Sequence, residues 1–358
     1  MVQIEDLAAQ VQRNCRISDA RFWGFHSICG LLLRLREQFK WEQGLEPWSK
    51  TDTAEVLPWI GEREAEWEQL QEAELEALSV GNGGVDPFDT VAVNARISPL
   101  GYFYGAGHGM AMKPLFVLGR VADRRCVEGT DVVVLGRELV RDLSPIPAMN
   151  RDGTIIARRE AMKWYLWQHL EEQGTKGPEG IAARALRSEG VEMAGLVGDP
   201  AAHGDFMDRF VKDETAAAVR HEIGEILEEK RMEGRWSRTF SLSCGTKAEL
   251  LSRGLKDVLA DTIDGGRLDY LTGRKALVSV GLFAAFSDGL RKRLFPELGG
   301  LFGNLVEEGD WGGLEKGRKK ANRRMRKFVE PLLGLFEEEM TAEERTGKTD
   351  ELEEKMMG

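Results

Sequence analysis

The spacing of apolar positions predicts three helices at the start of the chain. The first is expected over residues 4–15, and the second over residues 18–41 with Ser18 and Asp19 at its N-cap. A third helix is expected over residues 51–80, where apolar residues recur at helical spacing until a glycine-rich stretch ends the pattern.

The pattern then changes to short strands. Tyr102–Tyr104, Leu115–Val121 and Asp131–Leu135 are rich in aromatic and β-branched residues and are separated by glycine-containing or charged turns. Connections of this length join antiparallel strands, so we expect a small antiparallel sheet. The proline-containing segment 144–147 is a break, and we place a domain boundary there.

The second half has helical periodicity throughout. The expected helices are Arg158–Glu172, Ile181–Ser188, Asp205–Met232, Thr246–Thr262, Arg267–Leu294 and Leu314–Met340. The sequence thus predicts a mostly α, α+β fold, in which a helical bundle (148–340) follows N-terminal helices with an inserted small antiparallel sheet (1–147). Residues 341–358 are charged and poor in apolar groups, so we expect a flexible acidic tail.

Composition limits the class of protein and the cellular compartment that we expect. The 358 residues carry a formal net charge of −11, and 42% of them are hydrophobic, as in ordinary globular proteins. The N-terminus lacks the order of a signal peptide, and the most apolar run (268–286) is interrupted by polar residues, so we expect no membrane span and a cytoplasmic protein. The four cysteines form no Cys-x-x-Cys pair, and we expect them to be reduced and mostly buried.

Two other patterns favour structural interpretations. The glycines of segment 101–109 are followed by a strand where a phosphate-binding loop requires a helix, so they indicate a hairpin and no nucleotide cofactor. The basic stretch 316–327 lies in an acidic chain without a nucleic-acid fold signature, so a solvated face near acidic segments is favoured and nucleic acid is an unlikely partner.

A histidine and several carboxylates share helical spacing in the bundle. Glu214, His221 and Glu225 fall within about 40° of one another on one helix face. On the next helix, Asp257 and Asp261 lie one turn apart. If small residues let the two helices approach closely, these side chains supply one nitrogen and several oxygens, a set that suits zinc, manganese or iron with open coordination positions.

This pattern carries the functional hypothesis. We expect His221, Glu225, Asp257 and Asp261 to bind a divalent transition metal, with Glu222 as proton acceptor for a bound water and hydrolysis preferred over redox chemistry. The possible further contributors are Glu214, His26, Glu37 and Glu64.

Alternatives remain open. His221 and Glu225 also suit an exposed i,i+4 pair, and Asp257 could pair with Arg253. A full His-Glu-x-x-His motif is missing. The second hypothesis is therefore a non-enzymatic interaction or regulatory protein that uses an aromatic-rich sheet and the basic C-terminal helix as contact surfaces. Substrate, metal identity and oligomeric state stay open.

The segments HEIGE (221–225), RGLKDVLADT (253–262), NCRISDAR (14–21) and NARISPLG (94–101) resemble an uncharacterised bacterial protein family over most of the chain. The resemblance implies a bacterial cytoplasmic setting and assigns no activity or catalytic residue.

Overall fold

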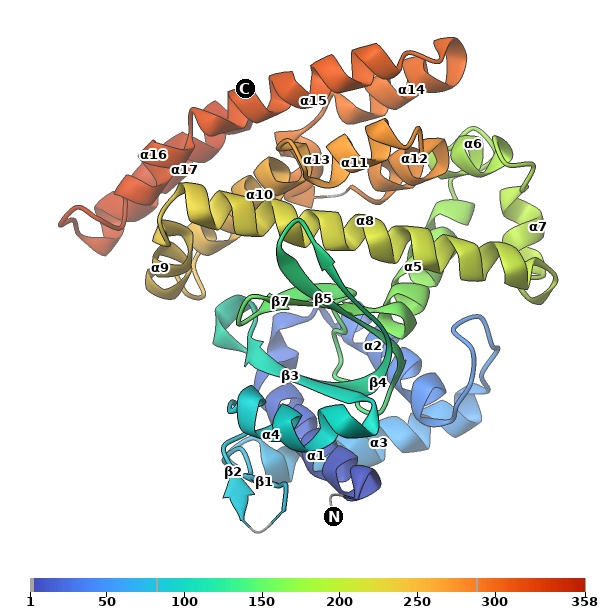
Figure 1. Cartoon of the computed structure of the whole chain (residues 1–358), viewed down its shortest axis with the longest axis vertical. Helices are drawn as coiled ribbons and strands as arrows, with labels where there is room; N and C mark the ends of the chain where they lie inside the picture. Colours follow the sequence, from blue (N-terminus) through green and yellow to red (C-terminus); the bar gives the residue numbers. More distant parts are fainter. Residues whose placement is uncertain (1–2, 82, 288, 358) are drawn as a thin grey trace. The chain divides into compact units, whose positions relative to one another are not determined.

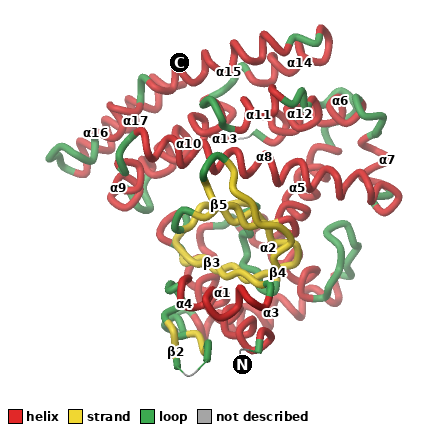
Figure 2. Tube along the Cα trace, in the orientation of Figure 1, coloured by secondary structure: helices red, strands yellow, loops and turns green. Residues whose placement is uncertain are grey.

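A computed structural model describes residues 3–81, 83–287 and 289–357. The chain divides into two compact units, residues 1–167 and 168–358, each of which is considered by itself below. Together, the helices and strands of the two units give the mostly helical α+β fold that the sequence predicts (Figures 1 and 2). The division lies twenty residues beyond the expected boundary at 147, because two further strands belong to the first unit.

The N-terminal unit combines helices with one principal sheet. Its helices and strands are α1 (Ile4–Phe22), α2 (Ile28–Glu42), α3 (Thr53–Leu70), β1 (Leu78–Ser79), β2 (Gly84–Val85), α4 (Thr90–Ile97), β3 (Tyr102–His108), β4 (Pro114–Val127), β5 (Thr130–Glu138), β6 (Ala148–Arg151), β7 (Thr154–Arg158) and α5 (Arg159–Gly174), the last of which continues into the second unit.

The principal sheet has the strand order β3-β4-β5-β7-β6 and curls around on itself (Figure 2). The predicted antiparallel meander is confirmed in β3, β4 and β5, but β7 pairs with β5 in parallel, so the sheet is mixed and larger than expected. The strands β6 and β7 form a hairpin around Asp152-Gly153, a dipeptide that favours tight turns between strands. The sequence reasoning overlooked this turn signal.

The first helix is longer than predicted. Ser18 and Asp19 lie buried inside α1 instead of starting a new helix. The Ser18 hydroxyl donates to the carbonyl of Pro114 over 2.7 Å, and Asp19 accepts from Lys113 over 2.7 Å. These long-range partners satisfy side chains that would otherwise favour a helix N-terminus. The break comes instead after residue 22, and Ser27 caps α2.

The C-terminal unit consists of helices packed around several apolar clusters. They are α6 (Ile181–Arg187), α7 (Met193–Gly198), α8 (Gly204–Arg231), α9 (Arg235–Leu242), α10 (Lys247–Thr262), α11 (Arg267–Gly273), α12 (Leu277–Phe286), α13 (Gly289–Leu294), α14 (Leu298–Glu308), α15 (Trp311–Arg326), α16 (Val329–Gly334) and α17 (Ala342–Met357).

Three expectations for this unit are wrong. The predicted helix 314–340 is divided into α15 and α16 and ends at Gly334. The predicted helix 267–294 is divided into α11, α12 and α13, with Lys275 at a positive φ between the first two. The predicted flexible tail forms α17, in which Met356 is 4% exposed and joins the core cluster of α10 and α16. Isolated apolar residues at helical spacing are enough to dock this otherwise charged segment.

The long helix α8 packs beside α10 (Figure 1). A methyl group at Gly224 of α8 would collide with the carbonyl oxygen of Ala260 on α10. Glycine therefore permits the close approach that the small residues around His221 predict, and it fixes which faces of the two helices meet.

The cysteines differ in part from the prediction. All four are free, but only Cys15 is buried, whereas Cys29, Cys126 and Cys244 are exposed. Within the described part of the chain, none of the helices has both the length and the apolar character needed to cross a membrane.

Candidate metal centre

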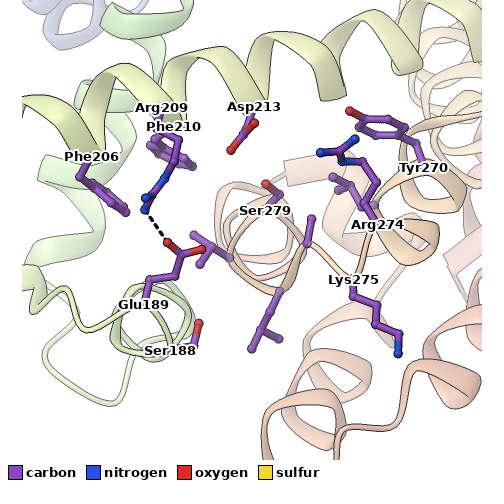
Figure 3. A pocket seen from close by; sticks show the side chains of 14 residues that line it. Ser188, Glu189, Phe206, Arg209, Phe210, Asp213, Tyr270, Arg274, Lys275 and Ser279 are labelled. Carbon is purple, nitrogen blue, oxygen red and sulfur yellow. Dashed lines mark hydrogen bonds and ion pairs between the residues drawn. The ribbon is translucent and has the colours of Figure 1, made fainter.

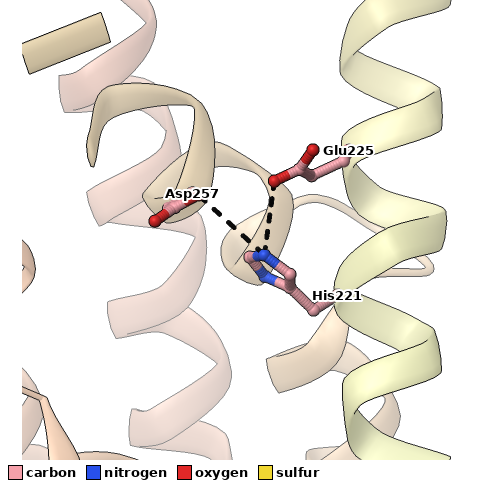
Figure 4. Close-up of side chains that lie close together, drawn as sticks. All are labelled: His221, Glu225 and Asp257. Carbon is pink, nitrogen blue, oxygen red and sulfur yellow. Dashed lines mark ion pairs between the residues drawn. The ribbon is translucent and has the colours of Figure 1, made fainter. Parts of the chain in front are cut away.

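Helices α8 and α10 bring four of the predicted side chains together. His221 Nε2 lies 3.4 Å from Glu225 Oε1 and 3.9 Å from Asp257 Oδ1 (Figure 4). Its other nitrogen, Nδ1, lies 2.8 Å from Asp261 Oδ1. The i,i+4 spacing on each helix stacks the side chains one turn apart, and the close contact at Gly224 sets the two pairs opposite each other.

Three of these residues have the spacing of a ligand set. One ligand atom each from His221, Glu225 and Asp257 lies within 4.8 Å of the others. Two atoms that each bind a tetrahedral metal at about 2.1 Å are about 3.4 Å apart, which is close to the observed separations. The three side chains are 14%, 29% and 32% exposed, so solvent can reach the site.

Asp261 has a different place from the one predicted. It accepts a hydrogen bond from His221 Nδ1–H on the side of the ring away from Glu225 and Asp257, so it is a positioning residue and not a member of the three-residue ligand set. A carboxylate in this place fixes the ring orientation and the tautomer that exposes Nε2. Asp261 is 1% exposed, and its Oδ2 has no hydrogen-bond partner within the described residues.

The charges of the cluster are strongly coupled. Burial opposes protonation of His221, but the carboxylates of Asp261 and Glu225 outweigh it and raise the pKa of His221 to about 10. Burial likewise raises the pKa of Asp261, yet His221 and Arg291 bring it down to about 2. For Glu225, hydrogen bonds and charges from His221 and Lys256 overcome burial and lower the pKa below its usual range. Burial dominates at Asp257 and raises its pKa.

Two cations in the cluster were missed by the sequence reasoning. Lys256 Nζ lies 3.4 Å from Glu225 and 3.0 Å from Glu229, and Arg291 Nη2 lies 3.0 Å from Asp257. Lys256 is the residue directly before Asp257 in the segment RGLKDVLADT, so the sequence alone could have suggested it as a member of the cluster. Arg291 is 34 residues from Asp257 on α13, and no spacing rule connects the two. Arg253 pairs with Glu249, so the alternative pairing of Asp257 with Arg253 is wrong.

The other predicted residues of α8 lie outside the ligand set. Glu222 is 9% exposed and is rotated by about 100° from His221 around the helix. Its role as proton acceptor stays a prediction. Glu214 lies two turns before His221, where it accepts a hydrogen bond from Ser279 and is influenced by Arg267. Burial raises its pKa, and its Oε1 lacks a hydrogen-bond partner among the described residues.

The three remaining predicted contributors, His26, Glu37 and Glu64, belong to the N-terminal unit. His26 lies between helices and not on α2, with Nε2 3.4 Å from the Ser144 hydroxyl. Glu37 lies 4.0 Å from the buried guanidinium of Arg141. Glu64 is exposed on α3. The ligand set consists of His221, Glu225 and Asp257 and includes none of these three residues.

A second acidic group consists of Asp264, Asp269 and Glu315. The buried guanidinium of Arg318 lies at its centre, with Nη2 between 2.7 and 3.2 Å from all three carboxylates. Arginine already occupies the position of a cation here, so this group is a structural ion-pair network. It offers a chemically matched control for the His221 cluster.

A cavity of about 340 Å³ lies between α8, α11 and the start of α12 (Figure 3). Its charged side chains are of both signs and include an ion pair between Arg209 and Glu189 at 2.5 Å. Asp213 and Ser279 also face it, but none of its lining residues belongs to the ligand set. The cavity is therefore separate from the candidate metal centre.

Comparisons with known proteins identify the family. Residues 6–158 match the N-terminal domain, and residues 163–356 the C-terminal domain, of a family of unknown function, DUF6866. No curated protein and no solved structure matches the chain. The two matched domains correspond closely to the two structural units, and the predicted resemblance to an uncharacterised family is confirmed. The chain therefore belongs to the DUF6866 family of unknown function.

Proposed function

We propose that the C-terminal unit binds one divalent transition metal through His221 Nε2, Glu225 and Asp257, and that the protein is a metal-dependent enzyme. The observation that carries the proposal is the convergence of these three ligand atoms while Asp261 holds the opposite nitrogen of the same imidazole. A carboxylate–histidine–metal arrangement is a recurrent way to orient a ligand ring.

The charge of the cluster supports this proposal. Without metal, His221 is protonated, and four carboxylates (Glu225, Glu229, Asp257 and Asp261) face three cations (His221, Lys256 and Arg291). A divalent metal that displaces the His221 proton adds two positive charges and removes one. The cluster therefore gains one unit of positive charge among its four carboxylates, in a partly buried site where mutual repulsion between carboxylates is unfavourable.

Three protein ligands leave positions for water and substrate, as in catalytic metal sites. A bound divalent metal lowers the pKa of its water toward neutrality, so hydrolysis is the reaction class that we favour. Glu222 is the residue that we expect to accept the proton, because it adjoins His221 in the chain. The four free cysteines fit the reducing cytoplasmic compartment that we expect for the protein.

The test is metal titration of the full chain by calorimetry after chelation, in buffers of different ionisation enthalpy. Because His221 must lose its proton, binding at pH 7 should release about one proton per metal, and affinity should rise about tenfold per pH unit. Replacement of His221 by Ala should abolish tight binding. Asp261→Asn should weaken it by about 10- to 100-fold even though Asp261 is outside the ligand set.

The matched control is the double variant Asp264→Asn/Asp269→Asn in the Arg318 network, which should leave metal affinity unchanged. The proposal fails if protein from metal-replete cells carries less than about 0.1 equivalent of transition metal and shows no thermal shift with zinc, manganese or anaerobic Fe(II). Catalysis is tested separately, because Glu222→Gln should retain the metal and lose hydrolytic activity.

A further inference from the structure

The basic stretch 316–327 separates into two sets of side chains in the structure. Four of its cations are paired with carboxylates: Arg318 with the three carboxylates of its network, Lys319 with Glu315, Arg324 with Glu297, and Arg326 with the fully buried Glu228. For this set, the expectation of cations near acidic segments of the same chain is correct.

The other four are Lys316, Lys320, Arg323 and Lys327, which we call the basic stripe. All are exposed, and among the described residues no carboxylate lies within ion-pair distance of them. Lys327 is the C-cap of α15 and keeps a helical backbone, so at 100° per residue the four fall within about 60° on one face and span about 16 Å along the axis. Lys320 contributes to the low pKa of Glu297 but makes no direct pair with it.

The stripe is held on a fixed support. The opposite face of α15 is buried through Leu314, Ala321 and Met325. The guanidinium of Arg318 donates a hydrogen bond to the carbonyl of Thr262 on α10. Like charges at i,i+4 destabilise a helix, and among the described residues no direct ion pair with the stripe offsets the repulsion. An anionic partner of matching spacing would offset it.

We propose that the basic stripe binds a short acidic helical segment of another protein, with carboxylates at positions i, i+4, i+7 and i+11. These intervals reproduce the spacing of the four cations, as in charge pairing between neighbouring helices. The stripe face of α15 carries no apolar residue, so the contact is electrostatic and governs association rate and specificity more than affinity.

The flanking charges favour a short partner over a long polyanion. Glu307 and Glu330 are paired with Arg184 and Arg235, but Glu308 before α15 and Glu339 after α16 are exposed, and no ion pair involves them within the described residues. A nucleic-acid strand that continued past the stripe would come near these acidic segments. An acidic segment of about 12 residues, which is about 18 Å long as a helix, ends before it reaches them.

The experiment measures binding of a fluorescent helical peptide with four glutamates at the stated positions to the full chain at low ionic strength. The variant K316Q/K320Q/R323Q/K327Q should bind at least tenfold more weakly. The control K50Q/K176Q/K212Q/K230Q has the same change in net charge at exposed lysines elsewhere and should bind within about twofold of the wild type. A peptide of the same composition with scrambled glutamates should also bind more weakly.

Two results overturn the proposal. Equal losses in the stripe and control variants would mean that only net charge matters. Tighter binding of a 20-base-pair duplex than of the peptide, with affinity falling at a logarithmic salt slope near −3.6, would assign the stripe to phosphate backbones. Circular dichroism and the melting temperature of each variant establish that the fold is retained. Lys320→Gln alone should weaken binding about threefold if the larger variant is unstable.

Discussion

The protonation of His221 should make the metal-free protein lose stability as the pH rises through the alkaline range. The folded-state pKa of His221 is about 10, above its ordinary value of 6.5. A group whose pKa is raised by folding contributes stability that is fully present below the unfolded pKa and is lost as the pH passes the folded pKa. The relevant window is therefore pH 6.5 to 10.

The size of the effect follows from the pKa difference. A shift from 6.5 to about 10 corresponds to at most about 5 kcal/mol of unfolding free energy. About 4 kcal/mol of it is present at pH 7 and about 1 kcal/mol at pH 9.5, so the contribution should fall by about 3 kcal/mol between these values. The carboxylates of the cluster with low pKa, Glu225 and Asp261, remain ionised throughout this range and add no slope.

Urea denaturation of the chelator-treated full chain at several pH values between 7 and 9.5 measures this contribution as the difference between wild type and His221→Gln. The His221→Gln variant should be less stable than the wild type at pH 7. The difference in unfolding free energy between the two should be smaller by about 3 kcal/mol at pH 9.5. His26→Gln is the matched control, because burial lowers the pKa of His26 and confines its titration to lower pH. A gap that stays constant across the range would refute the proposed protonation of His221 and with it the expected proton release on metal binding.

Three further predictions concern individual contacts. Lys256→Met removes a cation that competes with metal for Glu225, so calorimetry should show metal affinity raised about threefold or more while the metal-free protein loses stability. Arg158→Met leaves Glu138 buried and unpaired, and should lower the unfolding free energy of the N-terminal unit by about 3–5 kcal/mol in urea titrations; an effect below about 1 kcal/mol would contradict the structure. Deletion of residues 342–357 exposes the core around Met356 and should lower the melting temperature by about 5 °C or more in calorimetry, whereas an undocked tail would leave it unchanged.

Local periodicity was sufficient for much of the fold. The helices around His221 and Asp257 and the strands between Tyr102 and Leu135 lie close to their expected positions, because alternating or 3.6-residue apolar patterns are properties of neighbouring residues. The errors occur where distant partners decide the outcome. The Ser18 hydroxyl donates a hydrogen bond to the carbonyl of Pro114, and Met356 packs into the core cluster of α10 and α16. The parallel pairing of β7 with β5 joins strands that are not consecutive in the chain.

The same division applies to the candidate site. The sequence by itself determined that His221 and Glu225 share one helix face and that Asp257 and Asp261 lie one turn apart on another helix, since both follow from helix geometry. Only the tertiary structure decided that Asp261 approaches Nδ1, that Glu214 is excluded, and that Lys256 and Arg291 balance the carboxylates. Those outcomes depend on the rotation and depth at which α8 meets α10, which are set by the contact of Gly224 with Ala260 and by packing across the whole unit.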